Sequence, residues 1–310
     1  MLRERMAVLG ISPAATVSAG GSCRLLRCAD DRWIAMNLAR RDDVDLLAAW
    51  MQRPWAGPVW DAVAAAADQQ AADAAVERAQ LLGIPAAVAV PPPTAAHRLV
   101  RSAPARRATG LVVDLSSLWA GPLCARLVAA ASGKRVVKVE DPDRPDGARA
   151  GPPAFWQRLN CGKDDVAVAL RTAPGRRELA ALLADADVVV TSARPRALDT
   201  LGLDPAEHAA RGVVWVAITG YGLTGAWSNR VAFGDDAAVA GGAAVAAGGE
   251  HPVFVLDAVA DPLSGLWGAA AALDALGAHR GAVIDVAMRD VVAAALTKGR
   301  YAARTDQEVA

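Results

Sequence analysis

The sequence lacks several features that mark whole classes of protein. Its 310 residues carry 33 basic and 33 acidic side chains, so no net positive charge is available to attract nucleic acid or anionic lipid. Aromatic residues make up only 5%, and no apolar stretch reaches the roughly 18 residues that a membrane-spanning helix needs. The first residues also lack the charged-then-apolar pattern of a secretory signal. We therefore expect a cytoplasmic protein that binds neither nucleic acid nor membranes.

Cysteine and histidine are sparse as well. The chain has four of each, and no cluster among them has the spacing of metal ligands. They are Cys23, Cys28, Cys124, Cys161, His97, His208, His251 and His279. We expect no bound metal, and cysteines that behave as small buried residues.

Apolar residues, in contrast, are plentiful. They make up 54% of the chain against 21% charged residues, so the chain can bury a sizeable core. From residue 110 onward, short apolar strands alternate with helical stretches of about a dozen residues, a pattern typical of βαβ units. The strands are predicted at 111–115, 135–140, 166–170, 187–191 and 213–218. The fold class is predicted as α/β, with a Rossmann-like parallel sheet in a domain covering 108–310.

The residues before this domain predict a second, smaller α+β domain, 1–90. Its predicted elements are a strand pair within 22–39, helices around 42–52 and 58–82, and an extended run after Gly83. The stretch 91–107 begins with three prolines and continues with several arginines, a composition that favours a linker.

Motifs of three common enzyme classes are missing. The turn after the strand 111–115 lacks the three spaced glycines of dinucleotide-binding proteins, and the chain has no Walker A phosphate loop. It also has no Gly-x-Ser-x-Gly elbow, and no histidine has an evident nucleophile beside it. NAD chemistry, ATP chemistry and serine hydrolysis therefore lack support.

One carboxylate stands where a ligand is expected, because open α/β sheets bind ligands beyond the carboxyl ends of their strands. Asp261 lies between an apolar run and a predicted helix, 262–278, so its carboxylate is held near exposed amide groups. From the residues alone, an N-cap followed by Pro262 at the first helical position explains Asp261 better than a catalytic role does. The two roles are compatible.

Several short runs, in order along residues 110–290, resemble the family III CoA-transferases, which include formyl-CoA and carnitine-CoA transferases and α-methylacyl-CoA racemases. The runs are VDLSSLWAGP at 113–122, VVKVE at 136–140, LNCGK at 159–163, ADVVV at 186–190, RPRAL at 194–198 with Leu201-Gly202, TGYG at 219–222 and DAVADPLSG at 257–265. The resemblance implies coenzyme A as co-substrate, an acyl-CoA and a carboxylic acid as substrates, no metal, and a homodimer that is interlocked in this family. Residues 20–90 resemble the smaller domain of the family, which normally follows the catalytic helix. The inverted order implies a circular permutation or a piece of a tandem fusion.

In this resemblance Asp261 matches the catalytic aspartate. Its carboxylate would attack the acyl-CoA thioester to give an acyl-aspartyl anhydride, and the CoA thiolate would return to form an aspartyl-CoA thioester. A carboxylic acid would then take over the CoA. Backbone N–H groups at the helix start would stabilise the oxyanions. Asp257 is expected to end a strand rather than to take part in the chemistry.

The resemblance also implies a set of CoA contacts. They are Leu118, Trp119, Lys138, Arg171, Ser192, Ala193 and Arg194. Basic side chains beside exposed amides would hold the phosphates, and Leu118 or Trp119 would cover the adenine. Two positions that are often basic in the family are Asp141 and Thr200 here, and Arg194, Arg196 and Arg149 are candidates to compensate.

Two alternatives remain open from the sequence. The racemases of the family use a His–Asp pair, and the histidine position matches Phe233, which cannot accept a proton, with Asp235 as the acidic partner. A 2-methylacyl-CoA racemase or isomerase is thus the weaker enzyme hypothesis. A non-catalytic CoA-binding subunit is the second alternative, suggested by the inverted order, Asp141 and Thr200.

Overall fold

The structure, a computed structural model, describes residues 1–94, 98–104 and 109–297, and this part of the chain forms two compact units. Unit 1 contains residues 1–94, 230–261 and 288–297, and unit 2 contains 98–104, 109–229 and 262–287. The predicted domain 108–310 therefore contributes residues to both units, whereas the predicted domain 1–90 lies within unit 1.

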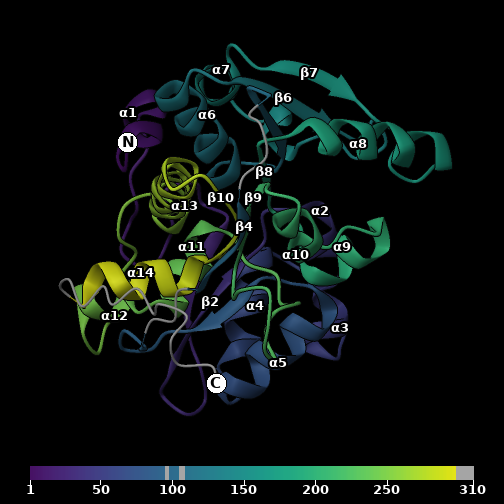
Figure 1. Cartoon of the computed structure of the whole chain (residues 1–310). Coiled ribbons are helices and arrows are strands. Elements are labelled where there is room, and N and C mark those ends of the chain that lie inside the picture. Colours follow the sequence, from purple (N-terminus) through teal and green to yellow (C-terminus); the bar gives the residue numbers. More distant parts are fainter. Residues whose placement is uncertain (95–97, 105–108, 298–310) are drawn as a thin grey trace. The chain divides into compact units, whose positions relative to one another are not determined.

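Unit 2 is built on a seven-stranded sheet (Figure 1). Its strands are β4 (Arg98–Pro104), β5 (Leu111–Leu115), β6 (Arg135–Glu140), β7 (Asp164–Ala167), β8 (Val188–Thr191), β9 (Val214–Thr219) and β10 (Arg280–Ala287). They lie in the order β4-β10-β9-β8-β5-β6-β7, and all neighbours pair in parallel except β4, which is antiparallel to β10. The predicted α/β class with a parallel sheet is confirmed.

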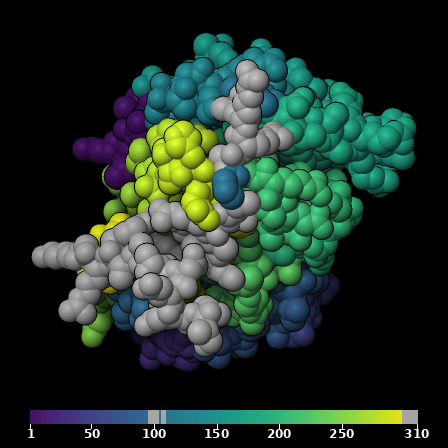
Figure 2. All heavy atoms as spheres, viewed as in Figure 1, coloured from purple at the N-terminus to yellow at the C-terminus, as the bar shows by residue number. Residues whose placement is uncertain are grey.

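Helices cover both faces of this sheet. They are α6 (Ala120–Ser132), α7 (Pro153–Asn160), α8 (Ala173–Asp185), α9 (Pro195–Leu201), α10 (Pro205–Ala210) and α13 (Ala260–Gly277), with a 3₁₀ turn η1 at Gly147–Ala150. Alternate strand residues point to opposite faces. On one face Leu183 of α8 packs in the same core as Val113 and Trp215. On the other face Gly268 of α13 lies close to Cys124 of α6 and to Val216, since a Cβ there would be 3.4 and 3.2 Å from them. Part of α13 reaches the surface (Figure 2).

Two strands of unit 2 differ from the prediction. β4 lies within the segment 91–107, where a linker was predicted from prolines and arginines. β10 was not predicted, because an acid, Asp285, interrupts its apolar run. In the structure the two carboxylate oxygens of Asp285 share a hydrogen bond from the Leu223 N–H, at 3.0 and 3.1 Å. The carboxylate therefore has a backbone partner in the loop after β9.

Unit 1 contains a three-stranded antiparallel sheet in the order β1-β2-β3. Its elements are α1 (Glu4–Leu9), β1 (Cys23–Arg27), β2 (Trp33–Asn37), α2 (Arg41–Asp45), α3 (Leu47–Met51), α4 (Val59–Ala67), α5 (Ala72–Leu82), β3 (Ala86–Val88), α11 (Gly234–Ala240), α12 (Ala243–Gly248) and α14 (Met288–Leu296). The predicted strand pair is confirmed. The single helix predicted over 58–82 is wrong: it is interrupted at 68–71, where the Asp30 carboxylate accepts a hydrogen bond from the Ala72 N–H at 3.1 Å and so begins a new helix.

Both faces of the small sheet are buried. Ile34 and Met36 pack in one core with residues of α3, α4 and α5. Ala35, which points the other way, packs in a second core with Val239 of α11 and Phe254. Residues from 230–261 thus complete unit 1 by covering the second face of its sheet.

Three further expectations, on membrane helices, metal sites and cysteines, can be compared with the described residues. None of the helices in the described ranges is long and apolar enough to cross a membrane. No three His, Cys, Asp or Glu side chains among these residues gather into a group that could hold a metal ion. The four cysteines are free thiols, and all but Cys161 are buried.

Candidate active site

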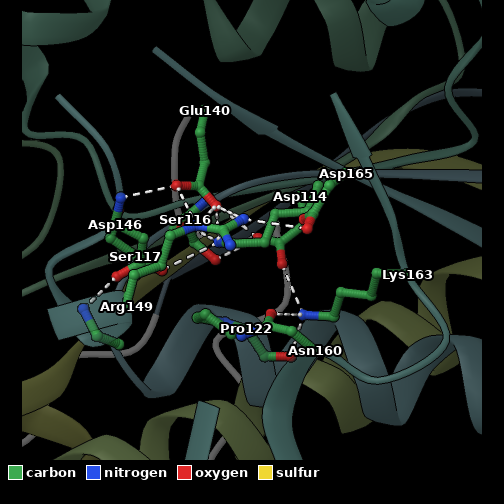
Figure 3. Close-up of polar contacts among 12 residues, drawn as sticks. Asp114, Ser116, Ser117, Pro122, Glu140, Asp146, Arg149, Asn160, Lys163 and Asp165 are labelled. Atoms are coloured by element: carbon green, nitrogen blue, oxygen red, sulfur yellow. Dashed lines mark hydrogen bonds and ion pairs between the residues drawn. The ribbon is translucent and has the colours of Figure 1, made fainter. Parts of the chain in front are cut away.

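The carboxyl end of β5 is held by a buried ion pair (Figure 3). The Asp114 carboxylate accepts hydrogen bonds from the Ser116 N–H at 3.0 Å and from the Lys163 ammonium at 2.8 Å, and the Ser116 hydroxyl also donates to it. Lys163 donates to the Pro122 carbonyl oxygen at 2.9 Å as well. Burial alone would raise the pKa of Asp114, but the nearby lysines outweigh it and lower that pKa below its usual value. The pair therefore stays charged and fixes the turn after β5.

Lys138 supports the same turn from within β6. Its side chain is fully buried, and its ammonium donates to the Ser116 carbonyl oxygen at 2.9 Å and lies 3.0 Å from an Asp146 oxygen. The other Asp146 oxygen accepts a hydrogen bond from the Leu118 N–H at 2.9 Å. This environment does not fit the predicted contact between Lys138 and a CoA phosphate, because the ammonium is enclosed by the protein. Lys138 instead holds the backbone of the turn at Leu118.

The two residues predicted to cover the adenine have opposite environments. Leu118 has a left-handed backbone, with φ 71°, and is 37% exposed. Trp119 is only 4% exposed, and its ring packs edge to face on Phe155 with centroids 5.0 Å apart. Behind them, a Cβ at Gly121 would lie 2.1 Å from the Ser116 side chain, so only glycine lets α6 begin this close to the turn. Leu118 is thus the residue of the two that a ligand can reach.

The remaining predicted contacts follow other strands. The Ser192 hydroxyl, after β8, accepts a hydrogen bond from the Ser117 N–H at 3.1 Å, which joins the ends of β5 and β8. Ala193 is partly buried against the core, and Arg194 donates to a loop carbonyl oxygen at 2.8 Å. Arg171 is exposed and follows the edge strand β7, which lies two strands from β5 in the sheet. The structure thus joins the turn at residues 116–118 to Ser192.

Arg149, a candidate for binding phosphate, already contacts two carboxylates (Figure 3). Its guanidinium lies 2.8 Å from Glu140 and 3.1 Å from Asp165, and it covers the Trp156 ring at 4.2 Å. These hydrogen bonds raise the pKa of Arg149, with the largest contribution from Glu140. The arginine closes the outer side of the β6 end rather than offering a vacant cation.

In unit 1, Asp261 is the second residue of α13 and is partly exposed. Its N–H donates to the Ala258 carbonyl oxygen at 2.9 Å. Its carboxylate lies directly beside Gly234, the first residue of α11, where a Cβ would be only 2.3 Å from Oδ2. The first turn of an 18-residue helix stabilises a negative charge through the helix dipole. Asp261 is therefore a partly exposed carboxylate in the first turn of a long helix.

The neighbouring carboxylates are buried and bonded. Asp235 accepts a hydrogen bond from the Ala258 N–H at 2.9 Å, and both oxygens of Asp257 contact one nitrogen of Arg5, at 2.7 and 2.8 Å. Burial, with a smaller effect of Asp257, raises the pKa of Asp235 to about 6. Burial also raises the pKa of Asp257 despite the opposing effect of Arg5. Sequence reasoning did not predict the contact with Arg5, which lies 252 positions away.

The residue that the resemblance matches to the racemase histidine, Phe233, is not the one beside the Asp261 carboxylate. Phe233 precedes α11, and its ring lies 5.5 Å from the Arg40 guanidinium. Gly234, not Phe233, lies beside the Asp261 carboxylate. Neither phenylalanine nor glycine can accept a proton, so a racemase would lack its base at either position.

Asp236 provides a test of this buried acidic environment. Its side chain is fully buried, and one oxygen accepts hydrogen bonds from the Phe233 N–H at 3.0 Å and the Asn37 amide at 3.3 Å. The other oxygen has no hydrogen-bond partner. Burial, supported by Asp235, raises the pKa of Asp236 to about 8.

Replacing Asp236 by asparagine is expected to change how stability depends on pH. Because the folded state retains the proton up to about pH 8 and the unfolded chain releases it near pH 4, the free energy of unfolding falls as the pH rises between these values. Asparagine does not titrate, so this loss with rising pH is absent in Asp236→Asn. As the pH rises, the free energy of unfolding of the variant should therefore increase relative to that of the wild type by up to about 1.4 kcal/mol per pH unit. Urea unfolding at pH 5, 6, 7 and 8 measures it. Parallel curves for the two proteins would contradict the prediction.

A known family shares the sequence motifs and the fold. The sequence profile of CoA-transferase family III matches residues 110–309. The chain belongs to CoA-transferase family III. Two curated relatives illustrate the likeness. Succinyl-CoA–D-citramalate CoA-transferase from Chloroflexus aurantiacus is 29% identical over 198 residues, which are 59% of this chain and 49% of that protein. Succinate–glutarate CoA-transferase from Agrobacterium fabrum is 30% identical over 208 residues, which are 60% and 51%.

Solved structures agree with this membership of family III. A hypothetical protein from Mycobacterium tuberculosis superposes with a TM-score of 0.56 at 30% identity, covering 63% of this chain and 57% of that one. A CAIB/BAIF family protein from Brucella suis superposes with a TM-score of 0.52 at 27% identity, covering 62% and 56%. The chain spans about half the length of the curated relatives it matches.

Proposed function

We propose that this family III member is a CoA-transferase that moves CoA from an acyl-CoA to a carboxylic acid through Asp261. One observation carries the proposal. Asp261 is partly exposed at the start of a long helix and lies against a glycine, whereas the side chains of Asp235, Asp236 and Asp257 are buried. Of these four carboxylates, only Asp261 is not buried, which supports its assignment as the one that meets the substrate.

The chemistry suits a carboxylate because each intermediate stays activated. An Asp261 oxygen attacks the thioester carbonyl carbon, the C–S bond breaks, and CoA leaves as a thiolate from an acyl-aspartyl anhydride. The thiolate then attacks the aspartyl carbonyl, so that the donor acid leaves and an aspartyl-CoA thioester remains. An incoming carboxylate repeats the two steps in reverse and departs with the CoA. Backbone N–H groups at the helix start are suited to stabilise the oxyanions.

For the CoA itself, the residues at the ends of β5 and β8 offer matching chemistry. Leu118 is an exposed apolar surface for the adenine, and Ser192 lies beside the same turn. Arg194, partly exposed, and Arg171, exposed, are cations for the phosphates. We assign Lys138 to support of this turn rather than to direct contact. Trp119 and Ala193 would shape the site from behind.

Mass spectrometry tests the proposal. The wild-type protein is incubated with acetyl-, propionyl- or succinyl-CoA, the last chosen because both relatives above are named for succinate or succinyl-CoA. We expect a covalent adduct that hydroxylamine converts to a hydroxamate, mapped to Asp261 by peptide analysis. No adduct with any of the three, or solvent deuterium entering the α-carbon of a 2-methylacyl-CoA, would contradict the transferase.

We further propose a cytoplasmic homodimer. The resemblance to the family supports the dimer, and the free thiols fit a reducing compartment. Light scattering after gel filtration should give about twice the monomer mass of 31.9 kDa. A monomer mass would contradict the dimer.

A further inference from the structure

The turn that leads into Asp261 has an unusual backbone. Leu256 has φ 60° and Ala258 has φ 44°, so two residues that are not glycine adopt the left-handed conformation on either side of Asp257. Side chains disfavour this conformation, and it persists only where the surroundings hold it. Ala258 is directly linked to Asp261, since its carbonyl oxygen accepts the Asp261 N–H at 2.9 Å.

Two contacts hold the turn from opposite sides. The Asp257 carboxylate is fully buried, and both of its oxygens lie within 2.8 Å of one guanidinium nitrogen of Arg5. The Ala258 N–H donates to Asp235 at 2.9 Å, and Asp235 also bonds to the Ser18 hydroxyl. One contact thus fixes the side chain in the middle of the turn, and the other fixes the backbone of the next residue.

Arg5 comes from a helix that has no core residue of its own. α1 is six residues long and none of its side chains is buried. The Arg5 side chain is 24% exposed, yet its partner Asp257 is completely enclosed. The helix therefore contributes no buried side chain to unit 1, and this ion pair links it to the turn before Asp261.

We propose that Arg5 is a positioning residue for Asp261, acting through Asp257 and the strained turn at 256–258. The ion pair keeps Ala258 in the left-handed conformation, which keeps the Asp261 carboxylate against Gly234 in its reactive placement. The N-terminal helix is thereby part of the catalytic apparatus. This inference rests on the proposed function of Asp261.

Acylation kinetics test the proposal. The acyl-CoA among acetyl-, propionyl- and succinyl-CoA that labels the wild type fastest is used with the full-length protein. In Arg5→Gln we expect the maximal rate of adduct formation to fall roughly 10- to 100-fold, since small displacements of a reacting group cost about this much. The acyl-CoA concentration at half-maximal rate should stay within about twofold. Arg5→Lys should recover part of the rate, and Arg3→Gln, at an exposed position just before α1, is the matched control.

A second variant separates positioning from folding. Glycine adopts the left-handed conformation without penalty, so Ala258→Gly in the Arg5→Gln background should restore at least several-fold of the lost rate. Hydrogen exchange gives a readout that needs no activity: the Ala258 and Asp261 amides should exchange faster in Arg5→Gln and recover in the double variant.

The outcomes separate this inference from the proposed function. If none of the three acyl-CoAs labels the wild type, both are overturned. If the wild type is labelled and Arg5→Gln is labelled at the same rate, or if the two amides exchange as in the wild type, only the positioning role is overturned. A loss of rate in Arg5→Gln that Ala258→Gly does not restore also overturns it.

Discussion

Replacing Asp261 by asparagine is expected to abolish formation of the acyl adduct. The amide has nearly the shape of the carboxylate but carries no charge and is a poor nucleophile, so the thioester is not attacked. We expect the rate of adduct formation to fall by at least about 10³-fold, as when other enzymes lose their nucleophile. Intact-protein mass spectrometry over time, with hydroxylamine capture, measures this directly.

The control for this variant lies on the same helix. Asp274 is exposed near the end of α13, and Asp274→Asn should be acylated at the wild-type rate. Asp261→Ala should match Asp261→Asn, which guards against activity regained by deamidation of the asparagine. CoA binding measured by calorimetry should persist in both Asp261 variants. An adduct that still forms in them, mapped to another residue, would remove Asp261 from the proposed role.

The parallel sheet of unit 2 could be predicted because its strands are short, almost entirely apolar runs. Val112 and Val113, like Val188 and Val189, are buried on both faces of the sheet, and this leaves a continuous hydrophobic signal in the sequence. β10 gave no such signal, since Asp285 lies within it. Its partner, the Leu223 N–H, becomes visible only after the chain is folded.

The candidate site could be predicted at the level of single residues, but not of contacts. The resemblance to family III assigned Lys138 to a contact with CoA. In the structure Lys138 lies within β6, and its buried side chain pairs with Asp146. Asp146 belongs to a loop, whose course cannot be predicted from hydrophobic periodicity. The Lys163 contact with Asp114 spans 49 positions in the same way. Such pairs depend on tertiary structure and leave no local pattern.

Unit 1 shows the same limit at Asp261. The resemblance matched Asp261 to the catalytic aspartate and Phe233 to the racemase histidine, but the residue beside the Asp261 carboxylate is Gly234. Only the structure shows which residue lies beside the carboxylate, because the two segments are about 27 positions apart in the sequence. The sequence therefore indicated the candidate nucleophile, but the residues in contact with it could be found only in the structure.

Replacing Gly234 by alanine is expected to block acylation and to weaken the fold. The new Cβ would lie 2.3 Å from an Asp261 oxygen and 2.5 Å from the Ala258 carbonyl oxygen, both well inside contact distance. The Asp261 side chain can rotate away, but the Ala258 oxygen belongs to the backbone, so α11 or the turn at 256–258 must shift. We expect the rate of adduct formation to fall about 10²-fold. The free energy of unfolding should fall by about 1–3 kcal/mol.

The matched control is Gly277→Ala, since a Cβ at the last residue of α13 would meet no atom within 4 Å. Both variants add one methyl group, so a difference between them reports the space beside Asp261 and not the loss of a glycine. Urea unfolding and adduct kinetics on the two proteins give the comparison. Acylation of Gly234→Ala at the rate of Gly277→Ala would show that the Asp261 carboxylate reacts from a different placement, away from the start of α11.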